Sequence, residues 1–167
     1  MEPYFLVATP QIQDPLFKNT VIFMIEHNEE GAIGFIINKP LHNSLNFLFE
    51  QFNWTARLPQ DQAILTGGPV GEGACFLVTE SNSEHKDINE ELIQGLIDKK
   101  IYFEMILGYS GWGAGQLEEE IKEGSWLCSD ISLDDILAVS IEDRYSKIVE
   151  DLGLDLLSLL SSPSFDA

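Results

Sequence analysis

Basic residues are scarce in this chain. Nine of its 167 residues are Lys or Arg, against 28 Asp or Glu, so the formal net charge is −19. A specific DNA-binding protein commonly makes about 6–10 phosphate contacts through Lys and Arg. Most of the nine basic residues would have to gather on one face, although only Lys99 and Lys100 are adjacent. We therefore expect no direct contact with nucleic acid, while the acidic surface favours solubility and, more weakly, a basic partner.

Long apolar runs are absent as well. The first apolar run, residues 4–8, is preceded by Glu2 instead of a basic segment, which argues against a secretory signal. No run approaches the ~18 apolar residues that a membrane-spanning helix needs. We expect a soluble, cytoplasmic protein that does not enter a membrane.

Motifs for metal binding and nucleophilic catalysis are missing too. Cys75 and Cys128 lie in apolar segments and are expected to be buried free thiols, which would pair only if the fold brought them together. His42 and His85 have no partner at ligand spacing, and the sequence holds no Cys-x-x-Cys or His-x-x-x-His. It also lacks Gly-x-Ser-x-Gly, and neither cysteine has a histidine beside it. We therefore predict no metal site, no cofactor and no catalytic residue.

The apolar residues that are present suffice for one domain. They make up 44% of the chain, and a domain of this size buries about 70% of the surface of its unfolded chain. With no repeat or linker, residues 1–167 are predicted to form a single domain. Residues 11–19, 81–87 and 110–115 are predicted loops, and Ser44 is the expected cap of the first helix. The pattern predicts strands at residues 4–8, 20–27, 32–38, 63–66, 74–79 and 101–109, and helices at residues 43–51, 89–99, 116–123 and 141–151.

The strands at residues 20–27 and 32–38 are apolar on both faces and are joined by a short polar connection that ends in Gly31. Such a hairpin has to be covered on two sides, so it belongs in the centre of the domain. The simplest register places His27 opposite Ala32 and Gly34 opposite Ile25. The glycine is expected to allow either a crossing element or a ligand to approach, with packing favoured.

The same register separates the polar residues of the hairpin into two clusters. Val21 would lie opposite Asn38, so His27 and Asn38 are six residues apart, or about 20 Å. Asn38 and Lys39 at the open end predict an Asp14–Lys39 ion pair that holds the preceding loop. At the turn, His27 either fixes the hairpin by hydrogen bonds, the favoured interpretation, or takes part in catalysis.

A glycine-rich segment, residues 110–115, stands between a predicted strand and a predicted helix. This order is typical of a phosphate-binding loop, but the sequence lacks Gly-Lys-Ser/Thr, and three glutamates follow in the first turn of the helix, where they would repel phosphate. Trp112, flanked by Gly113, is either a core residue or a platform for a planar ligand. Packing in the core is the favoured interpretation.

Three segments together identify a family that the chain resembles. They are FKNTVIFMIEHNEEGAIGFIINKPL at residues 17–41, GGPV at residues 67–70 and LGYSGWGAGQLEEEI at residues 107–121. This set resembles the YqgE/AlgH family (DUF179, UPF0301), uncharacterised bacterial proteins of which some are labelled transcriptional regulators. The resemblance implies an α+β fold: a largely antiparallel, bifurcated sheet with a small barrel-like portion, surrounded by helices. Between residues 78 and 101 the chain lacks an extended segment that relatives usually carry, and the family supplies no catalytic residues.

Two functions remain open. The favoured hypothesis is a non-enzymatic binding or adaptor protein, or an indirect regulator, with an unknown protein or small molecule as partner. Its candidate ligand-binding residues are His27, Asn28, Trp112 and Gly113. The alternative is a hydrolase-like enzyme that uses His27 and Asn28 near the glycine-rich segment. The two differ in whether His27 and Asn28 line a concave pocket with Trp112; the oligomeric state is left open.

Overall fold

The predicted hairpin lies at the centre of the fold. In the computed structural model, which describes residues 3–80, 83–85 and 88–153, strands β2 (Val21–Asn28) and β3 (Gly31–Ile36) form an antiparallel pair. Strand β1 (Tyr4–Ala8) pairs with β2, and β8 (Phe103–Gly113) pairs with β3. The first half of β2 and the end of β3 are fully buried, as expected for a hairpin covered on both faces.

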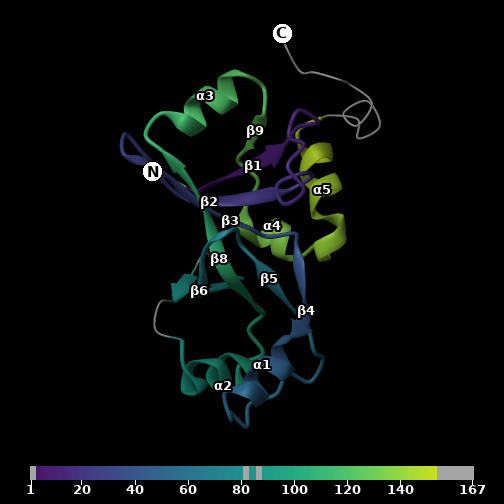
Figure 1. Ribbon diagram of the computed structural model, residues 1–167. Helices are drawn as coiled ribbons and strands as arrows, with labels where there is room; N and C mark the ends of the chain where they lie inside the picture. Colours follow the sequence, from purple (N-terminus) through teal and green to yellow (C-terminus); the bar gives the residue numbers. More distant parts are fainter. Residues whose placement is uncertain (1–2, 81–82, 86–87, 154–167) are drawn as a thin grey trace.

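The sheet divides at β8. Its main path runs β4–β5–β8–β3–β2–β1–β9, while β6 pairs with the first half of β8 and carries β7 at its edge (Figure 1). All pairs are antiparallel except β5–β8. The predicted α+β fold with a bifurcated sheet is confirmed. The pairings in the described part of the chain leave that sheet open, so the expected barrel-like portion is not closed. The remaining strands are β4 (Pro40–Ser44), β5 (Ala63–Thr66), β6 (Val70–Thr79), β7 (Ser83–His85) and β9 (Trp126–Ser129).

Helices cover the two branches of the sheet separately. Near the β6 branch lie α1 (Leu45–Gln51) and α2 (Glu90–Asp98), at the bottom of Figure 1. Around the hairpin branch lie α3 (Gln116–Lys122), α4 (Leu133–Leu137), the 3-10 turn η2 (Ile141–Asp143) and α5 (Arg144–Asp151). None of the helices in the described ranges is long and apolar enough to cross a membrane.

Three apolar clusters form the core. One cluster joins one face of the hairpin to α4 and α5 and contains both Phe23 and Ile148. A second joins the other face to α3 through Trp112 and Leu117. The third, around Phe49, fills the β6 branch beneath α1 and α2. The hairpin is therefore buried by helices on both sides.

The register of the hairpin agrees with the prediction at the turn and differs from it by one residue toward the open end. His27 does lie opposite Ala32, but Gly34 lies opposite Met24, because a β-bulge at Ile25 adds one residue to β2. The predicted Ile25–Gly34 pair is therefore wrong. The predicted Val21–Asn38 pair is wrong as well, because Ile22 lies opposite Ile36. A Cβ atom on Gly34 would lie 2.6 Å from the Met24 sulfur, so close packing explains this glycine.

Several predicted boundaries also change. Residues 110–113 are not a loop but the end of β8, and residues 83–85 form the short strand β7 instead of a loop. The first helix begins at Leu45, after β4, although Ser44 caps it through the Phe47 N–H as predicted. Cys75 and Cys128 are both free, but Cys75 is half-buried and Cys128 is exposed. The apolar stretch of the sequence at residues 154–160 lies outside the described residues.

Candidate binding site at the hairpin tip

A hollow of about 240 Å³ opens at the tip of the β2–β3 hairpin. Glu26 and Asn28 lie two residues apart on β2, so both side chains point to the same face of the sheet. Ile33 lies opposite Glu26 on β3, and Trp112 borders the hollow from β8. The other lining residues are Glu30, Gly31 and Ala32.

Hydrogen bonds fix the polar side of this hollow. The Asn28 amide donates from Nδ2 to Glu26 Oε1 over 3.2 Å, and its Oδ1 accepts the Glu30 backbone N–H at 2.8 Å. Asn28 thereby orients the Glu26 carboxylate and closes the turn that carries Glu30. The lining contains two carboxylates and no Lys or Arg. Such a set of acceptors suits a cationic hydrogen-bond donor, an ammonium or a guanidinium.

His27 lies on the opposite face and does not line the hollow. Its Nδ1 is 2.7 Å from the Tyr4 hydroxyl, and its Nε2 is 3.1 Å from Glu118 Oε1 on α3. The backbone N–H of Glu118 and the His27 side chain hold the pKa of the Glu118 carboxyl below its usual range. Burial, with nearby Cys128 and Glu118, raises the pKa of Tyr4 to about 12. Both ring nitrogens of His27 therefore tie β2 to β1 and α3.

Trp112 packs in the core instead of presenting its ring face. It is 8% exposed and meets Trp126 edge to face, with ring centroids 6.0 Å apart. The indole N–H groups of Trp112 and Trp126 both donate to Glu120 Oε1, over 3.1 and 2.9 Å. The Gly113 N–H donates to Gln116 Oε1. Trp112 borders the hollow, but its indole lies on the same face of the sheet as His27, because Ala32 pairs with both residues. The Trp112 indole N–H and the Gly113 N–H already have partners.

The predicted Asp14–Lys39 pair does not form. Asp14 Oδ1 accepts the N–H groups of Leu16 and Phe17, and the ion pairs among the described residues do not include Lys39. Asn38 holds the loop instead, because its Oδ1 accepts the Val21 N–H at 2.9 Å and its Nδ2 donates to the Asn19 carbonyl at 2.9 Å.

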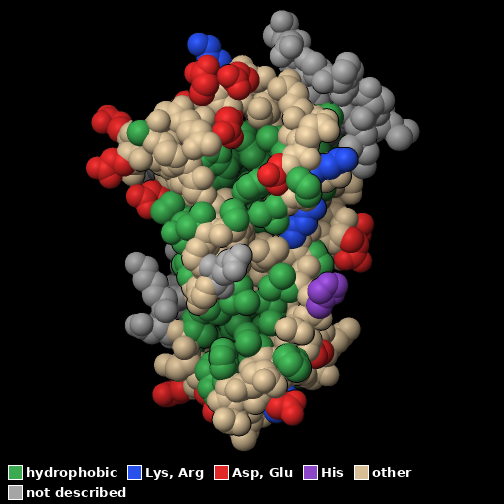
Figure 2. Space-filling model, in the orientation of Figure 1, with side chains coloured by type: hydrophobic (Ala, Val, Ile, Leu, Met, Phe, Trp, Pro, Cys, Tyr) green, Lys and Arg blue, Asp and Glu red, His purple; other side chains and the backbone are tan. Residues whose placement is uncertain are grey.

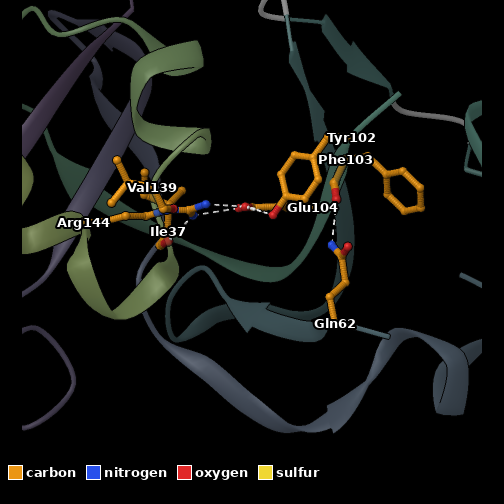
Figure 3. Close-up of polar contacts among 7 residues, drawn as sticks. All are labelled: Ile37, Gln62, Tyr102, Phe103, Glu104, Val139 and Arg144. Atoms are coloured by element: carbon orange, nitrogen blue, oxygen red, sulfur yellow. Dashed lines mark hydrogen bonds and ion pairs between the residues drawn. The ribbon is translucent and has the colours of Figure 1, made fainter. Parts of the chain in front are cut away.

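A buried ion pair, Arg144–Glu104, was not predicted. Each residue is 1% exposed. Arg144 Nη1 donates to Glu104 Oε1 and to the Ile37 carbonyl, each over 2.8 Å, and Nη2 contacts Glu104 Oε2 (Figure 3). Burial alone would lower the pKa of Arg144, but the hydrogen bonds and charge of Glu104 raise it. The available signal was Glu104 itself, a lone carboxylate inside the apolar segment IYFEMIL.

The described residues contain no cluster of three or more His, Cys, Asp or Glu side chains arranged to hold a metal ion.

Known proteins resemble this chain along nearly its whole length. The AlgH-like family model DUF179 matches residues 5–157. A UPF0301 protein of Photobacterium profundum is 36% identical, covering 93% of this chain and 94% of the relative. One from Vibrio parahaemolyticus is 35% identical and covers 91% of each. The solution structure of the AlgH protein from Pseudomonas aeruginosa matches with a TM-score of 0.70 at 31% identity, over 98% of this chain and 94% of that one. A crystal structure from Corynebacterium diphtheriae shares the fold, with a TM-score of 0.68 at 21% identity over 94% and 88%.

Proposed function

The chain belongs to the AlgH-like family (DUF179, UPF0301), and we propose that it is a binding protein without chemistry of its own. Its ligand is a cationic group, a primary ammonium or a guanidinium, carried by a small molecule or a partner protein. The hollow at the hairpin tip receives that group. The observation that supports this proposal is the lining of the hollow, where Glu26 and Glu30 face the opening without a compensating cation.

The charge around the hollow strengthens the proposal. Glu29 stands between the lining residues Asn28 and Glu30, and acidic side chains gather at this end and over α3 in Figure 2. A concave surface lined by one sign of charge raises the local concentration of oppositely charged ligands. Each exposed ion pair contributes only about 0.2–1 kcal/mol. A lone ammonium should therefore bind with a Kd of about 1 mM or weaker, and a physiological ligand needs further contacts.

The test is a titration with agmatine, which carries an ammonium and a guanidinium, followed by amide chemical shifts in the nitrogen-15-labelled protein. We expect saturable shifts at Asn28, Gly31 and Ile33. The substitution E26Q should weaken binding at least about twofold. E123Q, on the exposed turn after α3, is the matched control and should leave the affinity unchanged. Equal effects of E26Q and E123Q, or shifts that never saturate at the hairpin, would reject the proposal.

The hydrolase alternative has less support. His27 and Asn28 are adjacent on β2 and point to opposite faces, and both nitrogens of His27 already have side-chain partners. An enzyme built on these two residues would have to break the His27–Glu118 contact when substrate arrives. Esterase activity that is lost in H27Q and kept in E26Q would restore this alternative.

We also infer that the protein does not bind DNA directly and that it lies in the cytoplasm. Direct DNA binding has little support, because the chain contains nine basic residues and 28 acidic ones. Failure to bind arbitrary duplex DNA even at low salt would agree with this. A cytoplasmic location is part of the same proposal, and the free thiols of Cys75 and Cys128 are compatible with a reducing compartment.

A further inference from the structure

A second hollow, of about 250 Å³, lies between the C-terminal end of α2 and the start of β8. This is the opposite end of the molecule from α3 (Figure 1). Ile101 and Tyr102 lie there, 38% and 37% exposed. The walls are mainly apolar, formed by Leu58, Pro59, Ile97, Ile101, Tyr102 and Phe103. The other two lining residues are Gln62 and one cation, Lys100.

The end of α2 places Lys100 in this lining. The Lys100 N–H donates to the Ile97 carbonyl and the Ile101 N–H to the Leu96 carbonyl, the pair of bonds that defines a Schellman motif. Lys100 occupies its left-handed position, with φ +57°, where glycine is usual and other residues are disfavoured. A cation after a helix also suits the helix dipole, but Lys99 supplies one without that strain. What a lysine at position 100 adds is a positive charge beside the apolar walls.

Among the residues that the structure describes, no carboxylate forms an ion pair with Lys100. The ion pairs in the described part of the chain are His27–Glu118 and Arg144–Glu104, so Lys100 is not in one. Two carboxylates close to the hollow in sequence have other partners. Asp98 accepts from the Gln94 side chain at 2.8 Å, and Asp61 accepts the Asn46 N–H at 3.0 Å.

Two other polar groups of the lining, the Tyr102 hydroxyl and the Gln62 amide, already have hydrogen-bond partners. The Tyr102 hydroxyl donates to Glu104 Oε2 at 2.5 Å, which holds its ring against the buried ion pair. Gln62 Nε2 donates to the Phe103 carbonyl at 2.7 Å (Figure 3). These donors point into the protein, so the walls offer apolar surface. Lys100 is then the group that can select a ligand by its charge.

We propose that this hollow binds a small amphipathic anion, a carboxylate on a medium-length acyl chain. The chain lies along Ile97, Ile101 and the Tyr102 ring, and the carboxylate meets the Lys100 ammonium. This site goes beyond the cation-binding function above, since it lies elsewhere and takes a ligand of opposite charge. The acidic hairpin end does not forbid it, because distant exposed charges are screened beyond about 10 Å at 0.1 M salt.

The test compares octanoate, octanol and octylamine, which share a chain and differ in charge. Amide spectra of the full-length labelled protein are recorded with each probe. We expect octanoate to give saturable shifts at Lys100, Ile101 and the Gln62 side-chain amide, and octylamine to bind more weakly. K100Q should weaken octanoate binding about threefold and leave octanol unchanged. K99Q, which removes the neighbouring charge outside the lining, is the matched control and should change little.

A second variant excludes unfolding as the cause of any loss. K100G removes the cation and relieves the left-handed backbone, so it should weaken octanoate binding while the protein becomes more stable. The proposal is overturned if octylamine binds as well as octanoate, if K99Q and K100Q have equal effects, or if no probe shifts these amides. E26Q should leave octanoate binding unchanged, which separates this site from the hairpin hollow.

Discussion

The Arg144–Glu104 pair offers the sharpest test of what holds the two branches of the sheet together. Arg144 opens α5 beside the hairpin, and Glu104 lies on β8 where β6 pairs with it. R144M would remove the guanidinium but keep much of the apolar side-chain volume. It would leave the Glu104 carboxylate buried, and the Tyr102 hydroxyl would be its remaining hydrogen-bond donor among the residues that the structure describes.

The expected cost follows from that uncompensated charge. Removing one partner of a buried ion pair typically costs about 3–5 kcal/mol. A domain has a total unfolding free energy of about 5–15 kcal/mol, so R144M should lose a large part of it. At about 2–4 °C per kcal/mol for a domain of this size, the melting temperature should fall by about 6–20 °C.

A double-mutant cycle distinguishes the pair from simple loss of packing. E104Q leaves Arg144 with the carbonyls of Ile37 and Val139, so it should cost less than R144M. The double variant E104Q/R144M has no buried charge, and its cost should fall below the sum of the single costs by about 1–3 kcal/mol. The assay is urea unfolding followed by circular dichroism. Additive costs, or a loss below about 1 kcal/mol in R144M, would refute the interpretation of this pair as a joint between the branches.

Two further predictions concern the hairpin. G31A should destabilise the protein by about 1–3 kcal/mol in urea unfolding, because Gly31 has φ +144° and a Cβ atom would lie 2.3 Å from the Trp112 carbonyl oxygen; G95A, with open space around it, should be neutral or stabilising. H27Q should flatten the dependence of stability on acid pH: His27 lowers the pKa of Glu118, a contribution present at neutral pH and lost as the pH falls through that lowered pKa, below the usual 4.5. Identical acid unfolding profiles of H27Q and the parent protein would contradict the second prediction.

The central position of the hairpin could be predicted because it depends on local sequence. A strand that is apolar at every position has to be covered on both faces, and β2 is buried from Val21 to Met24. The same uniformity hid the bulge at Ile25, since a strand without polar alternation gives no sign of where its register shifts. The cap at Ser44 was predictable for a similarly local reason, a hydroxyl before a helical apolar pattern.

The glycine-rich segment could not be placed correctly from sequence. Glycines at residues 111 and 113 are typical of a loop, yet both lie in β8 paired with β3. Gly31 is needed because the Trp112 carbonyl comes close, and that contact joins residues 81 positions apart, which no local pattern contains. Likewise, Glu104 signalled a need for a buried cation, but nothing in the sequence selected Arg144 among nine basic residues.

The two candidate sites also differ in how far the sequence could predict them. Asn28 could be assigned to the hairpin turn because its neighbours define that turn, and alternation along β2 then forces His27 to the other face. The second hollow combines two segments, from Leu58 to Gln62 and from Ile97 to Phe103, and its charge depends on a helix end. Only the folded chain brings these segments together.

Strand β8 connects the two hollows for which we propose ligands of opposite charge. Its last residues, through Trp112, border the acidic hollow, and its first residue, Phe103, borders the apolar hollow at Lys100. Between them, Glu104 is fixed by Arg144, which blocks that carboxylate from adding negative charge to the second hollow. Loss of Arg144 should therefore impair octanoate binding at Lys100 more than agmatine binding at Glu26, because the released charge lies beneath Tyr102 and far along β8 from the hairpin tip.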